Sequence, residues 1–213
     1  VDFHNHFLPR AFPPLADGLV EPAWPRMEVD GDKGMMFVGD RPFRGFDSLY
    51  WDVEKRLAGM DAEGTDLQLI SPLPEILSYW VDPAAALILT DSVNRACVAM
   101  VAEAPKRLRG LAVLALQDPD VALRQARALD GVAGIVGLFV GSNVNGVSIA
   151  NERFDPIWAE CARQGLIVFV HGIRPAAVDR LEGPPLMGAV VGIPQENSLA
   201  VASFMMRDIL GRI

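Results

Sequence analysis

A regular alternation of helical segments and short apolar runs, from Asp52 onward, is the feature that most restricts the fold of this chain. The predicted helices are 52–63, 83–104, 119–129, 154–164 and 196–210, and the predicted strands between them are 66–71, 108–116, 134–140 and 166–170. Strands this apolar, each followed by a helix, are typical of a parallel sheet covered by helices. The pattern therefore predicts an α/β protein built from consecutive βα units.

The first seven residues add one more strand. Polar and aromatic side chains alternate with period two in residues 1–7, which is typical of a strand with two different faces. Residues 8–50 are rich in Pro and Gly and show no sustained period. We interpret 8–50 as a long insertion loop with a short hairpin, and loops of this length in compact domains are usually functional.

Five βα units fit two architectures. A (β/α)8 TIM barrel needs eight units and typically about 250 residues, so this architecture requires the chain to be incomplete. A five-stranded flavodoxin-like sheet requires no further sequence, and the count of units alone slightly favours it. In either case we expect residues 1–213 to form a single domain.

Composition limits the classes of partner. The chain is 51% hydrophobic, and its net charge of −8 argues against nucleic-acid binding, so a small molecule is the expected partner. Cys97 and Cys161 lie in amphipathic helical patterns without the close spacing of a redox or zinc motif, which fits a reducing cytoplasm. Apolar runs are broken by Gly, Pro or charge, and residues 1–9 lack the pattern of a secretion signal. We therefore expect no membrane association.

The chain contains only three histidines, and each falls at the carboxyl end of a predicted strand. His4 and His6 project from the same face of the first strand, and His171 directly follows the strand 166–170. A lone His-x-His pair would more often be two partly exposed histidines, but sites of α/β proteins are built at carboxyl ends of strands. Neutral imidazole suits zinc and similar divalent metals, and three protein ligands with an open position are typical of catalytic sites. We predict a divalent-metal site, with zinc as the expected ion.

Three segments resemble one family. The start Val-Asp-Phe-His-Asn-His-Phe-Leu-Pro resembles the first-strand metal motif of the amidohydrolase-2 branch of the amidohydrolase superfamily, which includes aminocarboxymuconate semialdehyde decarboxylase. Residues 56–66 are similar to the helix that precedes the second strand of that branch. Residues 154–162, with the strand before His171, are similar to its fifth unit. This resemblance implies the TIM barrel, with His4, His6 and His171 as metal ligands.

The resemblance also implies residues that cannot be assigned here. The family has a catalytic His after the sixth strand and a metal-binding Asp after the eighth, whereas this chain stops at Ile213, before the expected sixth strand. The catalytic residue is therefore unknown. Many relatives carry Pro after the fifth-strand His, and Gly172 stands there in this chain, so we expect the loop 172–195 to differ.

Arg44, within the insertion, is the candidate substrate-binding residue. By resemblance to the decarboxylases it pairs with a substrate carboxylate, for which a planar guanidinium is well suited. A solvated loop arginine is the alternative. Trp51 is a candidate wall for an aromatic substrate, although packing of the insertion over the barrel is the favoured use of this residue. Glu196 lies near a helix start, where we expect it to complement the helix dipole.

The sequence thus favours a metal-dependent decarboxylase of a small unsaturated or aromatic carboxylic acid. A metal-dependent hydrolase of an amide, ester or lactone remains an alternative, because the same metal site serves both chemistries. A non-enzymatic, flavodoxin-like binding domain is the third interpretation. A homodimer is compatible with each of them.

Overall fold

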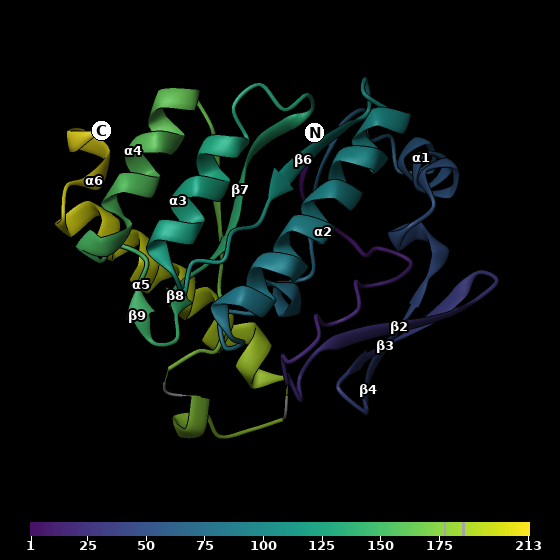
Figure 1. The fold of residues 1–213 in the computed structure, drawn as a ribbon, viewed down its shortest axis with the longest axis horizontal. Helices are drawn as coiled ribbons and strands as arrows, with labels where there is room; N and C mark the ends of the chain where they lie inside the picture. Colours follow the sequence, from purple (N-terminus) through teal and green to yellow (C-terminus); the bar gives the residue numbers. More distant parts are fainter. Residues whose placement is uncertain (177, 185) are drawn as a thin grey trace.

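A five-stranded parallel sheet forms the centre of the computed structural model, which describes residues 1–176, 178–184 and 186–213. Its strands lie side by side in the order in which they occur in the chain (Figure 1). They are β1 (Asp2–Phe7), β5 (Gln68–Pro72), β6 (Leu108–Ala112), β7 (Ile135–Gly141) and β10 (Ile167–His171). The short hairpin of β8 (Asn143–Val144) and β9 (Val147–Ser148) follows β7.

This strand order decides between the two predicted architectures. In a doubly wound sheet the order reverses at a switch point. Here each successive strand is added on the same side of the previous one, so every crossover runs in the same direction. The sheet is therefore half of a barrel, and the flavodoxin-like alternative is wrong.

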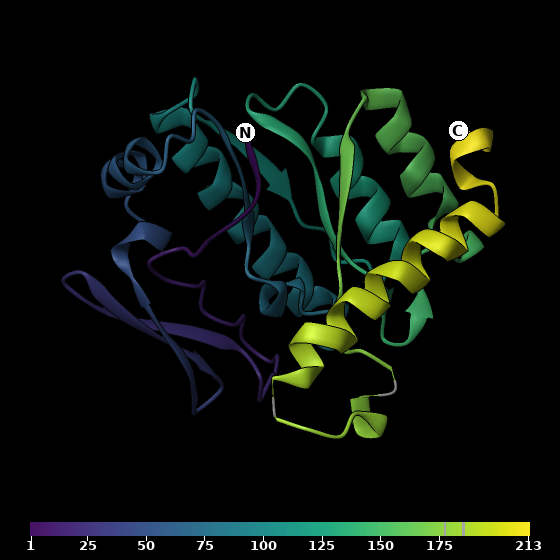
Figure 2. The same cartoon turned by 180° about the vertical axis from the view of Figure 1, so that it is seen from behind.

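The helices that cover the sheet match the predicted segments closely. They are α1 (Val53–Ala62), α2 (Pro83–Glu103), α3 (Pro119–Ala128) and α4 (Asp155–Gln164), and α2, α3 and α4 lie on the same face of the sheet (Figures 1 and 2). Asp118 caps α3 by accepting from the backbone N–H groups of Asp120 and Val121. The main hydrophobic core lies between these helices and the sheet.

The insertion contains more regular structure than the sequence pattern indicated. Strands β2 (Pro25–Asp30), β3 (Lys33–Val38) and β4 (Arg41–Asp47) form a three-stranded antiparallel sheet, so the prediction of a loop with a short hairpin is wrong. Only Met36 in β3 and Phe46 in β4 are buried in those two strands, and one buried residue in a strand is too few to produce a visible period. The 3-10 turn η1 (Ser48–Tyr50) then leads to α1.

Helix α2 corrects one expectation. Its 21 residues include a window of mean hydropathy 1.4, so by length and composition it is apolar enough to cross a membrane. Asp91 and Arg95 interrupt this helix without lowering the average below that level. Buried side chains such as Leu89 and Val93 join the main core, and α2 packs on β6, as expected for a core helix.

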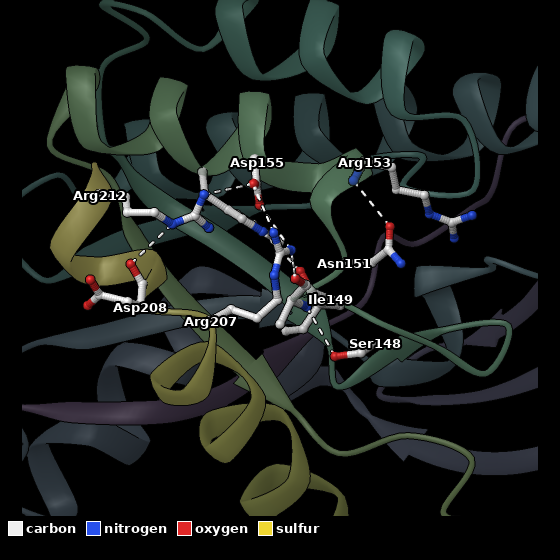
Figure 3. A network of polar contacts seen from close by, with 10 residues as sticks. Ser148, Ile149, Asn151, Arg153, Asp155, Arg207, Asp208 and Arg212 are labelled. Atoms are coloured by element: carbon white, nitrogen blue, oxygen red, sulfur yellow. Dashed lines mark hydrogen bonds and ion pairs between the residues drawn. The ribbon is translucent and has the colours of Figure 1, made fainter.

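The C-terminal segment is two helices where one was predicted. A π-helical turn, η5 (Gly188–Gly192), leads into α5 (Ile193–Met206), and Asp208, at φ +50°, separates α5 from α6 (Ile209–Arg212). Arg207 and Arg212 both reach Asp155 at the start of α4, at 3.4 and 3.3 Å (Figure 3). These ion pairs fix the far end of α5 against α4.

Candidate metal centre

His4, His6 and His171 meet at the carboxyl ends of β1 and β10. One ring nitrogen from each residue can be chosen so that all three lie within 4.8 Å of one another. The ring centroid of His4 lies 5.0 Å from that of His6 and 5.3 Å from that of His171. The predicted convergence of the three histidines is therefore confirmed.

Backbone carbonyls define the tautomers of two of these rings. Nδ1 of His6 lies 3.0 Å from the carbonyl oxygen of Pro72, and Nδ1 of His171 lies 2.8 Å from that of Gly172. A carbonyl oxygen can only accept, so both Nδ1 atoms carry the proton and donate it. The Nε2 lone pairs of His6 and His171 remain available for a metal ion.

Burial keeps the same two imidazoles neutral. Burial is the largest cause of a lowered pKa for His6, and the charges of His4, His171 and Arg44 act in the same direction, so that the pKa falls from 6.5 to about 4. Burial also lowers the pKa of His171. Neutral imidazoles with oriented Nε2 atoms fit a borderline divalent cation.

A cavity of about 710 Å³ opens above this centre. His6 and His171 line it together with Arg44, Tyr50 and Trp80. The cavity thus joins candidate metal ligands, the guanidinium of Arg44 and two aromatic rings in a space that suits a small organic molecule.

Arg44 lines the cavity, whereas Trp51 does not and is packed as the favoured interpretation of this residue expected. The guanidinium of Arg44 lies over the ring of Phe46, at 4.9 Å, and has no ion-pair partner within the described ranges. Trp51 is only 8% exposed and packs in the core beneath the three-stranded sheet, where a Cβ on Gly34 would lie 2.9 Å from its ring. Tyr50 and Trp80 line the cavity in its place.

Two further charged residues line the cavity that the sequence analysis did not single out. Glu75, in the turn η2 (Pro74–Leu77) after β5, has a buried Oε2 without a hydrogen-bond partner among the described residues. The guanidinium of Arg174 lies 3.9 Å over the ring of Trp80. Their position just after strand ends is the one sequence signal that could have identified them.

Arg56 holds the backbone of the candidate metal centre at His6. It is 7% exposed, and its guanidinium donates to the backbone carbonyl of His6 at 2.7 Å and to Oε1 of Gln68 at 3.0 Å. Burial lowers its pKa, although an arginine remains cationic at neutral pH. Arg56 thereby ties α1 to the backbone of β1 at His6, the second of its two candidate ligand positions.

Glu196 has a different environment from the one expected. It lies in the first turn of α5, as predicted, but it is 6% exposed and its carboxylate reaches the loops that follow β7 and β10. A residue that only complements the helix dipole needs no such contacts. The dipole interpretation is therefore incomplete.

Comparisons with known proteins agree with this geometry. The profile of the amidohydrolase family matches residues 1–213. A 2-amino-3-carboxymuconate-6-semialdehyde decarboxylase of Dictyostelium discoideum is 30% identical over 214 residues, which cover 100% of this chain and 59% of that protein. The chain thus spans about three fifths of the length of this relative.

Solved structures share the fold. The apo IDCase of Metarhizium anisopliae superposes with a TM-score of 0.78 at 19% identity, over 100% of this chain and 62% of that one. A dihydroxybenzoic acid decarboxylase of Polaromonas, solved with manganese and the inhibitor 2-nitroresorcinol, gives 0.63 at 22% identity, over 71% of this chain and 48% of that one.

The half-barrel sheet and its histidine cluster define an α/β protein of the TIM-barrel class with a candidate metal centre at the carboxyl ends of the strands. The chain belongs to the amidohydrolase family.

Proposed function

We propose that the protein is a metal-dependent decarboxylase of a small aromatic or unsaturated carboxylic acid. The observation that carries this proposal is a single cavity in which His6 and His171 lie beside Arg44, an arginine with no ion-pair partner among the described residues. The decarboxylase names of the relatives described above support it.

His4, His6 and His171 would hold the metal ion through ring nitrogens, with a fourth ligand expected by family resemblance from an Asp beyond this chain. When bound, a divalent cation would supply a Lewis acid that orients the oxygen atoms of the acid and stabilises developing negative charge. Imidazole ligands suit zinc, and zinc is our proposed ion, whereas manganese occupies the structure of the Polaromonas relative.

Arg44 would bind the substrate carboxylate. Its guanidinium lies over the ring of Phe46, and its N–H groups would donate to two carboxylate oxygens. Trp80 and Tyr50 would flank the rest of the acid. In the reaction the bond between the carboxyl carbon and its neighbour breaks, carbon dioxide leaves, and the electron pair that stays on the neighbouring carbon takes up a proton.

Glu75 would select substituents on the acid. Glu75 lines the same cavity as Arg44, and its buried Oε2 has no donor among the described residues, which is costly for an acceptor. A hydroxyl or amino group on the substrate would supply that donor. We therefore propose hydroxy- or amino-substituted acids as the preferred substrates.

We propose a reducing compartment such as the cytoplasm. Cys97 and Cys161 are both buried and free. Burial raises the pKa of each thiol to about 12, so neither is activated for disulfide exchange at neutral pH.

The direct test is product analysis. Protein loaded with Zn²⁺ or Mn²⁺ is incubated with hydroxy- and aminobenzoic acids and muconate-type acids, and in parallel with esters, lactones and amides. We expect release of carbon dioxide from the acids, and faster turnover of a hydroxy-substituted acid than of its unsubstituted analogue. Efficient hydrolysis without release of carbon dioxide would replace the decarboxylase by the hydrolase alternative.

A further inference from the structure

Glu196 is the centre of a buried hydrogen-bond network beside the histidine cluster. Its Oε1 accepts from the backbone N–H of Ala176 at 2.9 Å. Its Oε2 accepts from the hydroxyl of Ser142 at 3.1 Å and from Nδ2 of Asn143 at 3.2 Å. Within the described part of the chain no cation pairs with this carboxylate, so neutral donors from two loops satisfy its charge.

Ser142 extends this network to the peptide group that follows His171. The hydroxyl of Ser142 donates a hydrogen bond to Glu196 and accepts one from the backbone N–H of Ile173 at 3.2 Å. The backbone N–H of Ser142 also donates to the carbonyl of His171 at 2.9 Å. Ser142 therefore holds the chain on both sides of Gly172.

The peptide group between Gly172 and Ile173 carries this restraint to the imidazole. A peptide group is planar, so fixing the direction of the Ile173 N–H also fixes the direction of the Gly172 carbonyl. That carbonyl accepts from Nδ1 of His171 at 2.8 Å. A continuous path of three hydrogen bonds and one peptide group thus runs from Glu196 to the ring of His171.

We propose that Glu196 is a positioning residue that sets the tautomer and orientation of His171 for metal binding. The metal-binding part of this inference rests on the proposed function, and the part on the tautomer does not. The acceptor at Glu196 dictates which way the Ser142 hydroxyl points. Without that acceptor the hydroxyl can rotate to the carbonyl of Ile173, 3.5 Å away, and its lone pairs turn from the Ile173 N–H.

The first measurement needs no metal. Nitrogen-15 chemical shifts of the His171 ring in chelator-treated protein report which nitrogen carries the proton. We expect the Nδ1–H tautomer in the wild type and a mixture of tautomers in Glu196→Ala. Gln195→Ala is the matched control, because Gln195 is the adjacent, exposed residue on α5. An unchanged His171 tautomer in Glu196→Ala would overturn the proposal.

The second measurement is metal affinity by competition of Zn²⁺ with a chelating dye, well below the melting temperature of every variant. Loss of a residue that orients a metal ligand typically weakens binding about 10- to 100-fold. We expect a Kd roughly tenfold higher for Glu196→Ala and an unchanged Kd for Gln195→Ala. A lower melting temperature with an unchanged Kd would reduce Glu196 to a structural role and contradict the proposal.

Ser142→Ala tests the path itself, and Glu196→Gln provides a milder variant if alanine at 196 prevents folding. Glutamine keeps one acceptor oxygen but turns an amide donor toward Nδ2 of Asn143 or the N–H of Ala176. Its Kd should therefore lie between those of the wild type and Glu196→Ala.

If Glu196 acts through Ser142, the double variant should lose about as much Zn²⁺ affinity as either single variant. If the fold-loss of Zn²⁺ affinity in the double variant equals the product of the losses in the two single variants, the two residues act independently and this path is contradicted. Absence of Zn²⁺ binding by the wild type would refute the proposed function, while the tautomer measurement would still decide the role of Glu196.

Discussion

The carbonyl oxygen of Gly172 lies 2.8 Å from Nδ1 of the preceding residue, His171, so the chain itself supplies the acceptor that orients this imidazole. The position cannot carry a larger residue without adjustment. A Cβ on Gly172 would lie 2.4 Å from the carbonyl oxygen of Ile193, where α5 begins. The close approach of α5 therefore favours glycine at position 172.

Gly172→Ala should therefore disturb the cluster. The clash is with backbone, so α5 or the residues after β10 must shift, and overpacking of this kind typically costs about 1–3 kcal/mol. We expect lower stability in urea and weaker Zn²⁺ binding. Gly165→Ala is a useful contrast, because Gly165 has open space but a φ of +68°, so it should lose stability without loss of Zn²⁺ affinity.

The metal-free protein should lose stability as the pH falls through the range from about 6.5 to about 4. The folded state holds the pKa of His6 at about 4, first through burial and then through the charges of His4 and His171, whereas the unfolded chain titrates near 6.5. The unfolded state thus binds more protons in this window, so stability rises with pH there.

This slope is measured by urea unfolding of chelator-treated protein at several pH values. His6→Gln removes the titrating group and should give a smaller slope than the wild type, which corrects for carboxylates that titrate in the same range. Equal slopes in the two proteins would show that the pKa of His6 is not lowered by folding.

Arg44→Ala should separate substrate binding from metal binding. We expect kcat/KM to fall by roughly one to three powers of ten, which corresponds to about 1.5–4 kcal/mol of charge-assisted pairing, with unchanged metal content. Arg26→Ala is a suitable control, since Arg26 pairs with Glu28 on the exposed sheet of the insertion. If Arg44→Ala loses metal together with activity, Arg44 maintains the structure of the metal centre and the separation from substrate binding is contradicted.

Arg56→Ala should lower the free energy of unfolding by about 2–4 kcal/mol, because the carbonyl of His6 and Oε1 of Gln68 would lose their donor in a buried position. The measurement is urea unfolding of the metal-free protein. Exposed Arg26→Ala should change stability by no more than about 0.5 kcal/mol. Similar small effects of both substitutions would mean that water replaces the guanidinium of Arg56.

Local pattern predicted the elements that the site is built on. The strand 166–170 and the helix 154–164 are observed within one residue, as β10 and α4, because apolar runs and end signals are local. The position of His171 at the end of a parallel strand followed directly. The three-stranded sheet of the insertion was missed because its register depends on pairing between strands that bury few residues.

Contacts that depend on how loops and helices pack were not predictable in this way. Glu196 meets Ser142 across 54 positions, and Arg56 meets the carbonyl of His6 across 50. Trp51 was a candidate cavity wall, with packing as its favoured use, and the fold directs its ring into the core, whereas Trp80 lines the cavity from another loop. Which aromatic residue lines the cavity depends on how loops that follow separate strands pack together.

Metal content tests the central claim, that His4, His6 and His171 form one metal centre, most directly. Purified protein is incubated with Zn²⁺ or Mn²⁺, freed of loose ions by gel filtration and analysed by mass spectrometry for bound metal per chain. We predict one tightly bound ion in the wild type and a loss of that ion in His171→Ala, whose fold is checked by circular dichroism. Equal metal content in the wild type and in a folded His171→Ala variant would contradict the account.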